Sequence, residues 1–388
     1  MKKYLTVASS FIIMLCLGSM FAWSVIAKEL ASDFGFSLSK TQLVFGIFFT
    51  VFPITMLLAG RMERRTGPKL LAFISAALFM GGYLLSSMSN GSYPLILFGM
   101  GVLSGAGTGF GYLAALTTPA RWFPGKKGLI TGIVVAGFGL AAVSFSLFAE
   151  NLLNSGFNVL ESLRIIGITY GAIVAVMALF VYNPSGYGEV KTKIDYSFLK
   201  TRKYLKLISG FFMGTFAGLL VIGSLTAIGA QYKIENHILV LGVSGFALAN
   251  CIGRITWGFL SDYIGANISI SLALTFQAIS IFLIGHTSLT PNLYLLFAAL
   301  IGFGFGSNFV LFAKETAQIF GLRDFGSVYP YIFLGYSLAG ILGPITGGLL
   351  FDLLKSFSLP TAIAAGMSLA GAILFLNLKY SKRVPVVK

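Results

Sequence analysis

The sequence predicts an all-α polytopic membrane protein in which twelve transmembrane helices form two six-helix halves. Hydrophobic residues make up 56% of its 388 residues and charged residues only 10%, whereas soluble domains carry about 25% charged residues. The apolar residues gather in windows of about 20 residues, the length of a membrane-spanning helix and twice that of a barrel strand. A short charged loop bracketed by glycines occurs twice, after the second and after the eighth window.

The first six windows lie before a polar interval that runs from Asn183 to Lys203. Lys2 and Lys3 precede the first window as in a signal peptide. Its apolar run of about 23 residues, however, exceeds the 7–15 residues of a signal sequence. We therefore expect this segment to stay in the protein as the first helix. The predicted helices of this half cover residues 5–27, 40–60, 70–89, 93–117, 127–150 and 164–182.

The last six windows follow the polar interval. It is the longest in the chain, contains proline and glycine, and ends in a basic cluster. Because it divides the windows evenly, we expect a cytoplasmic linker at residues 183–203 between an N-terminal half (1–182) and a C-terminal half (204–388). The predicted helices of the C-terminal half cover residues 204–226, 238–261, 267–286, 292–313, 327–351 and 360–379.

The net charge of +15 could suggest a nucleic-acid partner, but the charges are distributed as in a membrane protein. With the N-terminus inside, 21 of the 27 Lys and Arg residues fall on the cytoplasmic side and five fall outside. The positive-inside rule therefore predicts that both termini face the cytoplasm. We expect a multi-pass protein of the cell's inner (plasma) membrane, surrounded by the lipid bilayer and without nucleic acid.

The repeated loop indicates that the two halves arose by duplication. Residues Gly60–Gly67 follow the second window and Gly258–Gly265 follow the eighth, 198 residues apart. Each copy is short, charged and bracketed by glycines. Internal repeats of this kind are typical of secondary transporters, and they favour a transporter over a channel or a membrane enzyme.

These loops resemble the signature of the major facilitator superfamily, G-x-x-x-D-[RK]-x-G. The C-terminal copy fits with Asp262, whereas the N-terminal copy has Arg64 in the usual Asp place and Glu63 one position earlier. The resemblance implies a major facilitator fold with rocker-switch alternating access, in which Asp262, Glu63, Arg64 and Arg121 take part in gating. We expect Asp262 to contact the N-terminal end of the helix at 327–351, where backbone N–H groups lack partners.

Other stretches narrow the resemblance to the oxalate:formate antiporter family and its monocarboxylate-transporter relatives. The similarity covers nearly the whole chain, and the motifs follow in the correct order on the expected helices. They are Phe21-Ala-Trp-Ser-Val25, Arg121-Trp-Phe-Pro-Gly-Lys-Lys-Gly128, Ala136-Gly-Phe-Gly-Leu140, Ala217-Gly-Leu-Leu-Val-Ile-Gly223 and Ser307-Asn-Phe-Val-Leu-Phe312.

Arg254 is the only charge in the 23 residues from Ile238 to Leu260. A guanidinium within a bilayer costs at least about 2.5–3.5 kcal/mol, so such residues usually face the bundle interior and meet an anion. Asn250 lies four residues earlier and shares its helix face, so one carboxylate could contact both side chains. Two other interpretations stay open: Arg254 could snorkel to the interface, and Asn250 could serve in interhelical packing.

Aromatic pairs at helical spacing are candidates for the walls of the pocket. Phe305 and Phe309 are four residues apart, and Phe333 and Tyr336 are three apart. Such pairs are more often core or lipid-facing residues. The family resemblance implies an aromatic box around the arginine, carried over here to Phe21, Tyr112, Phe305, Phe309 and Phe333.

Tyr336 matches the place of a lysine that, in the oxalate transporter, pairs with the second carboxylate of the dianion. One buried cation balances one negative charge, and an unpaired buried carboxylate costs several kcal/mol. The sequence therefore favours a monocarboxylate of the lactate, pyruvate or formate type. An oxalate:formate-type antiporter and a carboxylate sensor that does not transport are the alternatives. Lys314 lies near the cytoplasmic end of its window, where we expect it to snorkel.

The coupling of transport stays open at the level of sequence. No Asp, Glu or His lies in the middle of a window, so proton symport, anion exchange and uniport are all compatible, and protons remain a candidate partner. The windows contain no nucleophile–base pair, metal cluster or nucleotide loop. We expect no enzymatic activity, no cofactor and no metal site, and a chain that works as a monomer.

Overall fold

The computed structural model describes residues 1–376 except residue 37 and residues 186–195. Every regular element in this part of the chain is helical. It contains twelve helical segments that are long and apolar enough to cross a membrane, as the apolar windows predict. Residues 377–379, the end of the last predicted window, lie outside the described residues.

The first three spans are built from α1 (Lys2–Leu17), η1 (Gly18–Ala22), α2 (Trp23–Phe34) and α3 (Leu38–Ser87). α3 contains two spans that meet at Gly67, where φ is 75° and ψ is 172°. This is the second bracketing glycine of the first repeated loop. Its counterpart, Gly265, has φ 86°. Both loops therefore end in a backbone conformation that L side chains rarely adopt.

The fourth span changes its winding partway along. It consists of α4 (Tyr93–Ile96), a π-helical segment η2 (Leu97–Leu103) and α5 (Ser104–Trp122). The Ser104 hydroxyl donates a hydrogen bond to the carbonyl of Gly99, five residues earlier, at 3.1 Å. Gly82 of α3 and Gly99 lie so close together that a Cβ on either one would collide with the other's carbonyl.

The N-terminal half is completed by η3 (Pro124–Lys126), α6 (Lys127–Asn154) and α7 (Val159–Ala178). The side chain of Asn158 and that of Glu161 form a reciprocal capping box at the start of α7. Within this half, α3 packs on α5 and α7, and α1 packs on α5, α6 and α7.

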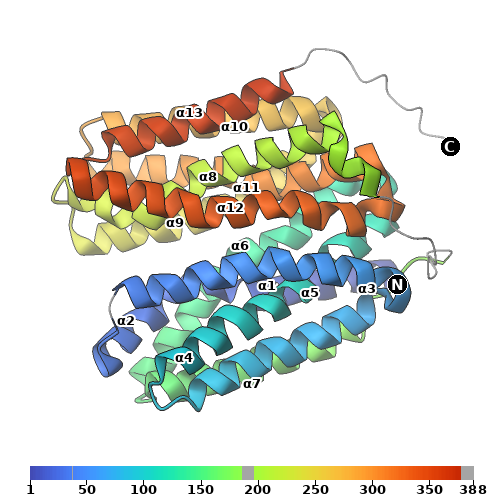
Figure 1. The fold of residues 1–388 in the computed structure, drawn as a ribbon, viewed down its shortest axis with the longest axis horizontal. Coiled ribbons are helices and arrows are strands. Elements are labelled where there is room, and N and C mark those ends of the chain that lie inside the picture. Colours follow the sequence, from blue (N-terminus) through green and yellow to red (C-terminus); the bar gives the residue numbers. More distant parts are fainter. Residues whose placement is uncertain (37, 186–195, 377–388) are drawn as a thin grey trace.

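The C-terminal half begins after η4 (Tyr196–Lys200) with α8 (Arg202–Ala230) and α9 (Asn236–Ile264). It continues with α10 (Ala266–His286), α11 (Pro291–Phe320), α12 (Leu322–Leu354) and α13 (Ser358–Phe375). α9 packs on α11, α8 packs on α12 and α13, and α10 packs on α13. Figure 1 shows the two groups of helices lying side by side with their axes roughly aligned.

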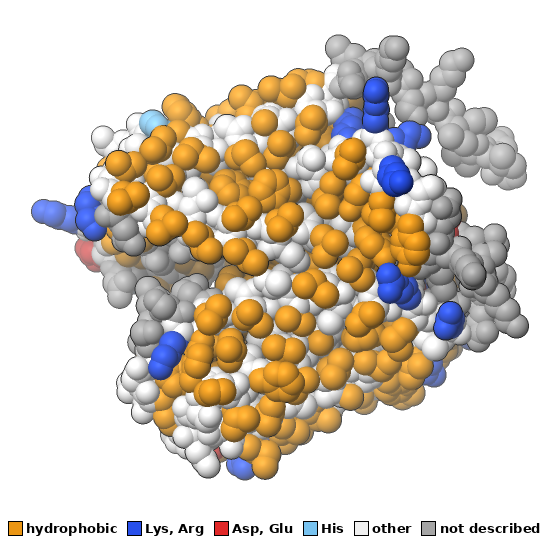
Figure 2. Space-filling model, viewed as in Figure 1, with side chains coloured by type: hydrophobic (Ala, Val, Ile, Leu, Met, Phe, Trp, Pro, Cys, Tyr) orange, Lys and Arg blue, Asp and Glu red, His pale blue; other side chains and the backbone are white. Residues whose placement is uncertain are grey.

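The two halves meet mainly along α6 with α9 and along α3 with α12. We call the end of the bundle that holds Lys2, Gly67 and Gly265 the linker end, and the opposite end the far end. Hydrophobic side chains cover most of the face seen in Figure 2, and Lys and Arg lie toward the two ends. This surface suits a protein surrounded by lipid, with its polar groups at the two interfaces.

Candidate functional site

Arg254 lies in the middle of α9 and is fully buried between the two halves. Its Nε donates to Oδ1 of Asn250 at 2.8 Å, and its Nη1 donates to the backbone carbonyl of Val135 on α6 at 2.5 Å. The guanidinium carbon is 4.6 Å from the ring centroid of Phe309, a cation–π contact. The guanidinium therefore does not snorkel, and Asn250 orients it.

The charge is held close to the α6 backbone because two glycines on that helix leave room for α9. A Cβ on Gly139 would lie 3.5 Å from the guanidinium carbon of Arg254. A Cβ on Gly132 would collide with the backbone carbonyl of Arg254. Small residues at such crossings let helices approach closely. Larger side chains at these two positions would push α9, and with it the guanidinium, away from α6.

Three polar atoms around the guanidinium are buried and have no hydrogen-bond partner among the described residues. They are Nη2 of Arg254 and the hydroxyls of Tyr112 and Tyr336. Both tyrosines are close enough to the guanidinium to interact with it electrostatically. Because buried polar groups are nearly always hydrogen-bonded, three unpaired groups from α9, α5 and α12 indicate a place that suits a small polar ligand.

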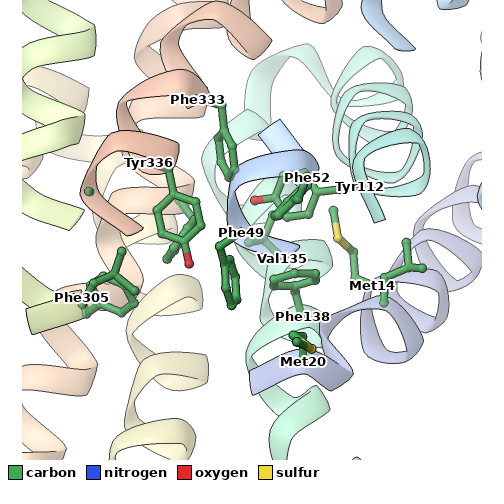
Figure 3. Close-up of a cluster of buried hydrophobic side chains, with 14 of the residues drawn as sticks. Met14, Met20, Phe49, Phe52, Tyr112, Val135, Phe138, Phe305, Phe333 and Tyr336 are labelled. Atoms are coloured by element: carbon green, nitrogen blue, oxygen red, sulfur yellow. The ribbon is translucent and has the colours of Figure 1, made fainter. Parts of the chain in front are cut away.

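The predicted aromatic residues come together in one connected cluster around this place. Phe305 and Phe309 meet edge to face at 5.3 Å between ring centroids. Phe309 is 5.3 Å from Tyr336, and Tyr112 is 5.4 Å from Phe333. In Figure 3 the Tyr336 hydroxyl points between Phe305 and Phe49.

Phe21 lies at the edge of the cluster. It is half-buried, and its ring is 5.4 Å from the rings of both Phe49 and Phe138. These two rings connect Phe21 to the rest of the cluster, so Phe21 belongs to the outer part of the box.

Sequence reasoning missed five further rings of the cluster. The ring of Phe52 meets that of Tyr112 edge to face at 5.1 Å and lies tilted against that of Phe333 at 5.3 Å between centroids. The spacing of Phe49 and Phe52 on one helix face and the place of Phe138 within a quoted motif were signals that could have found them. With 37 phenylalanines in the chain, spacing alone does not separate them from the ordinary core. The missed rings are Phe49, Phe52, Phe138, Phe211 and Tyr329.

Asp262 joins the two halves at the linker end, but the helix that it contacts is not the one expected. Its carboxylate accepts hydrogen bonds from the backbone N–H groups of Gly128 at 3.2 Å and Leu129 at 3.1 Å. These groups open α6, so the expected contact with the start of α12 is wrong. The chemistry is as expected, since a carboxylate meets the positive end of a helix.

Lys314 does not snorkel, contrary to expectation. Its ammonium lies 2.5 Å from Asp262 and donates to the Ser261 hydroxyl at 2.9 Å, with its side chain 4% exposed. The cation comes from the same half as Asp262. It is thus engaged at the linker end and is not a second cation of the aromatic box.

Glu63 lies at the second junction, between α3 and α12. It forms an ion pair with Arg121 at 2.8 Å and accepts a hydrogen bond from Thr117 at 2.7 Å. A Cβ on Gly326 of α12 would collide with the Glu63 carboxylate, so this acid lies against the N-terminal part of α12. The backbone of Arg64 is helical, but its side chain lies outside the described residues.

The family model of the Major Facilitator Superfamily matches residues 8–243 and 207–387. The chain is 26% identical to the oxalate:formate antiporter of Oxalobacter formigenes, over 90% of this chain and 85% of that protein. It is 24% identical to apicoplast pyruvate carrier 1 of Toxoplasma gondii, over 79% of this chain and 68% of that protein.

Solved transporter structures share the fold at low identity. The transporter FucP, the fucose:proton symporter of E. coli, has in its outward conformation a TM-score of 0.67 at 16% identity, covering 94% of this chain and 97% of that one. A bacterial homologue of the iron transporter ferroportin in its outward-facing state has a TM-score of 0.75 at 14% identity, covering 97% and 98%. The chain therefore belongs to the Major Facilitator Superfamily and is a membrane transporter, not an enzyme.

Proposed function

We propose that the chain transports small monocarboxylates, with Arg254 as the residue that binds the carboxylate. The observation that carries this proposal is the buried guanidinium, whose Nη2 has no hydrogen-bond partner in the part of the chain that the structure describes. A carboxylate there would neutralise the charge and accept a hydrogen bond from Nη2, with Arg geometry suited to two parallel bonds. The unpaired hydroxyls of Tyr112 and Tyr336 can donate to its remaining oxygen atoms.

The charge balance of the box supports a monoanion over a dianion. Lys314 is a buried lysine on α11, but it is paired with Asp262 at the linker end. Tyr336 offers a hydroxyl and no charge. A dianion would therefore leave one carboxylate facing hydroxyls and rings alone, at a cost of several kcal/mol. The names of the similar antiporter and pyruvate carrier fit a small carboxylate substrate.

The position of the site supports rocker-switch alternating access. Arg254, Phe309 and Tyr336 belong to the C-terminal half, whereas Val135 and Tyr112 belong to the N-terminal half. A ligand between them contacts both halves at once. One chain supplies all of these residues, which fits a monomeric carrier. The positive-inside rule would place the linker end on the cytoplasmic side of the cell's inner membrane.

Substitution of Arg254 tests the proposal. We expect Arg254→Gln to abolish uptake of labelled pyruvate and lactate into proteoliposomes, and Arg254→Lys to be poor because an ammonium lacks the planar fork. The exposed Arg164→Gln is the matched control. Wild-type uptake by Arg254→Gln would show that Arg254 does not bind substrate.

A panel of acids separates the alternatives. Ligands that bind the folded state raise its apparent stability, by about 2.7 kcal/mol at a concentration 100 times Kd. We expect thermal shifts with lactate, pyruvate or formate that Arg254→Gln loses. Larger shifts with oxalate or malonate would favour the dicarboxylate antiporter, and shifts without uptake would favour a sensor.

A further inference from the structure

Two carboxylates are buried among the side chains that the structure describes, Glu63 and Glu315. Glu63 is paired with Arg121. Glu315, which is 5% exposed, accepts a hydrogen bond from Nδ2 of Asn267 at 2.8 Å. Within the described residues no ion pair joins Glu315 to a cation. It is therefore a buried acid that can accept a proton without the loss of an ion pair.

The cations around Glu315 are engaged or lie farther away. Lys206 of α8 donates to Oδ1 of Asn267 at 3.2 Å, so the amide of α10 stands between ammonium and carboxylate. Lys314, next along α11, is paired with Asp262 of α9. Lys206, Lys314 and Lys203 all attract the Glu315 carboxylate electrostatically, Lys203 the least, but none of them forms an ion pair with it among the described residues. The partner of Glu315 is a neutral amide, which tolerates both protonation states.

Glu315 shares α11 with the proposed substrate site and with the linker-end junction. Phe309, whose ring lies under Arg254, is six residues earlier, or about 9 Å along the helix at 1.5 Å per residue. Lys314, bound to Asp262, is its neighbour. α11 also contacts α6 of the other half. A change in the protonation of Glu315 therefore affects a helix that contributes residues to both the substrate site and the linker-end junction.

We propose that Glu315 binds the proton that accompanies the carboxylate anion, which makes the chain a proton-coupled carrier. This inference rests on the proposed function. The proton comes from water on one side, bonds to a Glu315 oxygen, and leaves to water on the other side. The anion brings one negative charge and the proton one positive charge, so the loaded and empty carrier have equal net charge. Transport is then electroneutral.

Accumulation and exchange in proteoliposomes test the two steps separately. With labelled pyruvate and a pH gradient of one unit, acid outside, we expect the wild type to accumulate substrate about tenfold, the equivalent of 1.36 kcal/mol. Glu315→Gln keeps an oxygen for Asn267 but cannot titrate. We expect it to lose this accumulation while still exchanging labelled for unlabelled pyruvate at equal pH.

The controls use another acid and a shorter carboxylate. Glu150→Gln, an exposed position at the far end of α6, should accumulate pyruvate like the wild type. Should Glu315→Gln fail to fold, Glu315→Asp must accumulate substrate with a shifted pH profile, and an unchanged profile counts against the proposal. Empty vesicles give the background.

The outcomes distinguish this inference from the function beneath it. Accumulation by Glu315→Gln at the wild-type level overturns the role of Glu315. Exchange by the wild type without accumulation also overturns it, while carboxylate transport stands. Absence of both exchange and accumulation with every acid of the panel overturns the proposed function itself.

Discussion

At the linker end the two halves meet twice, once where α9 reaches α6 and once where α3 reaches α12. Both junctions bring glycines together: Gly258 lies against Gly128, and Gly60 lies against Gly326. The acids differ. Asp262 reaches across to the backbone of α6, whereas the hydrogen bonds and ion pair of Glu63 are with residues of its own half.

A shift of one position in the loop accounts for this difference. In the C-terminal loop the acid lies where it can meet the start of the opposite helix. In the N-terminal loop Glu63 is one residue earlier, about 100° around the helix, and points to Arg121. The close contact of glycines is thus common to both junctions. The acid of one junction hydrogen-bonds across it, whereas the acid of the other lies against Gly326 but is paired within its own half.

The largest expected effect on stability comes from breaking the ion pair between Glu63 and Arg121. Arg121→Met leaves the Glu63 side chain, 3% exposed, without its cation, and we expect a loss of about 3–5 kcal/mol in the free energy of unfolding. Lys314→Met should cost less, because Asp262 is 17% exposed and keeps two backbone donors. Unfolding in detergent measures both. An equal or larger loss for Lys314→Met would contradict the comparison.

The glycine contacts should matter next. Gly258→Val pushes a side chain into the carbonyl of Gly128, and overpacking of about 1–3 kcal/mol corresponds to a shift of about 5–150-fold toward the state with the linker end open. Gly60→Val should act similarly. Spin-label distances between the ends of α9 and α6 report the shift. Gly245→Val, which meets nothing within 4 Å, is the control, and closed junctions in both variants would refute the shared role.

The smallest effect isolates the acid that crosses between halves. Asp262→Asn alone would also strand Lys314, so it is made in the Lys314→Met background. In that background we expect Asp262→Asn to change the free-energy difference between the closed and open states by about 0.3–1 kcal/mol, the contribution of a charge at a helix end. The same spin-label distances should report a shift of a few-fold in the populations of these states. Glu63→Gln in the Arg121→Met background should shift them less. The reverse order would mean that Glu63 is the acid that joins the halves.

The fold could be predicted almost completely because bilayer thickness imposes a length on each helix. The windows missed the polar ends, since a window stops at charges while the helix continues. The window 292–313 ends just before Lys314 and Glu315, yet α11 runs to Phe320. Hydropathy therefore places both charges at the membrane interface, although tertiary contacts bury them.

The candidate site was only partly predictable. Arg254 and Asn250 could be found because a lone charge and a spacing of four residues are local properties. Which helix faces Asp262 depends on the packing of distant segments, and nothing in its own loop specifies α6 over α12. The rings of Phe52 and Phe211 are likewise placed by helix crossing, which residue type and spacing do not encode.

The π-helical segment η2 has a consequence for how this chain is compared with its relatives. A π turn holds more residues than an α turn, and each extra residue rotates the rest of the helix by about 100°. Such a turn corresponds to a one-residue insertion, which the glycines at positions 82 and 99 accommodate. A carrier that lacks it would present a different side chain where Tyr112 faces Arg254. An alignment with such a carrier would therefore need a gap within 97–103 before Tyr112 is equated with one of its residues.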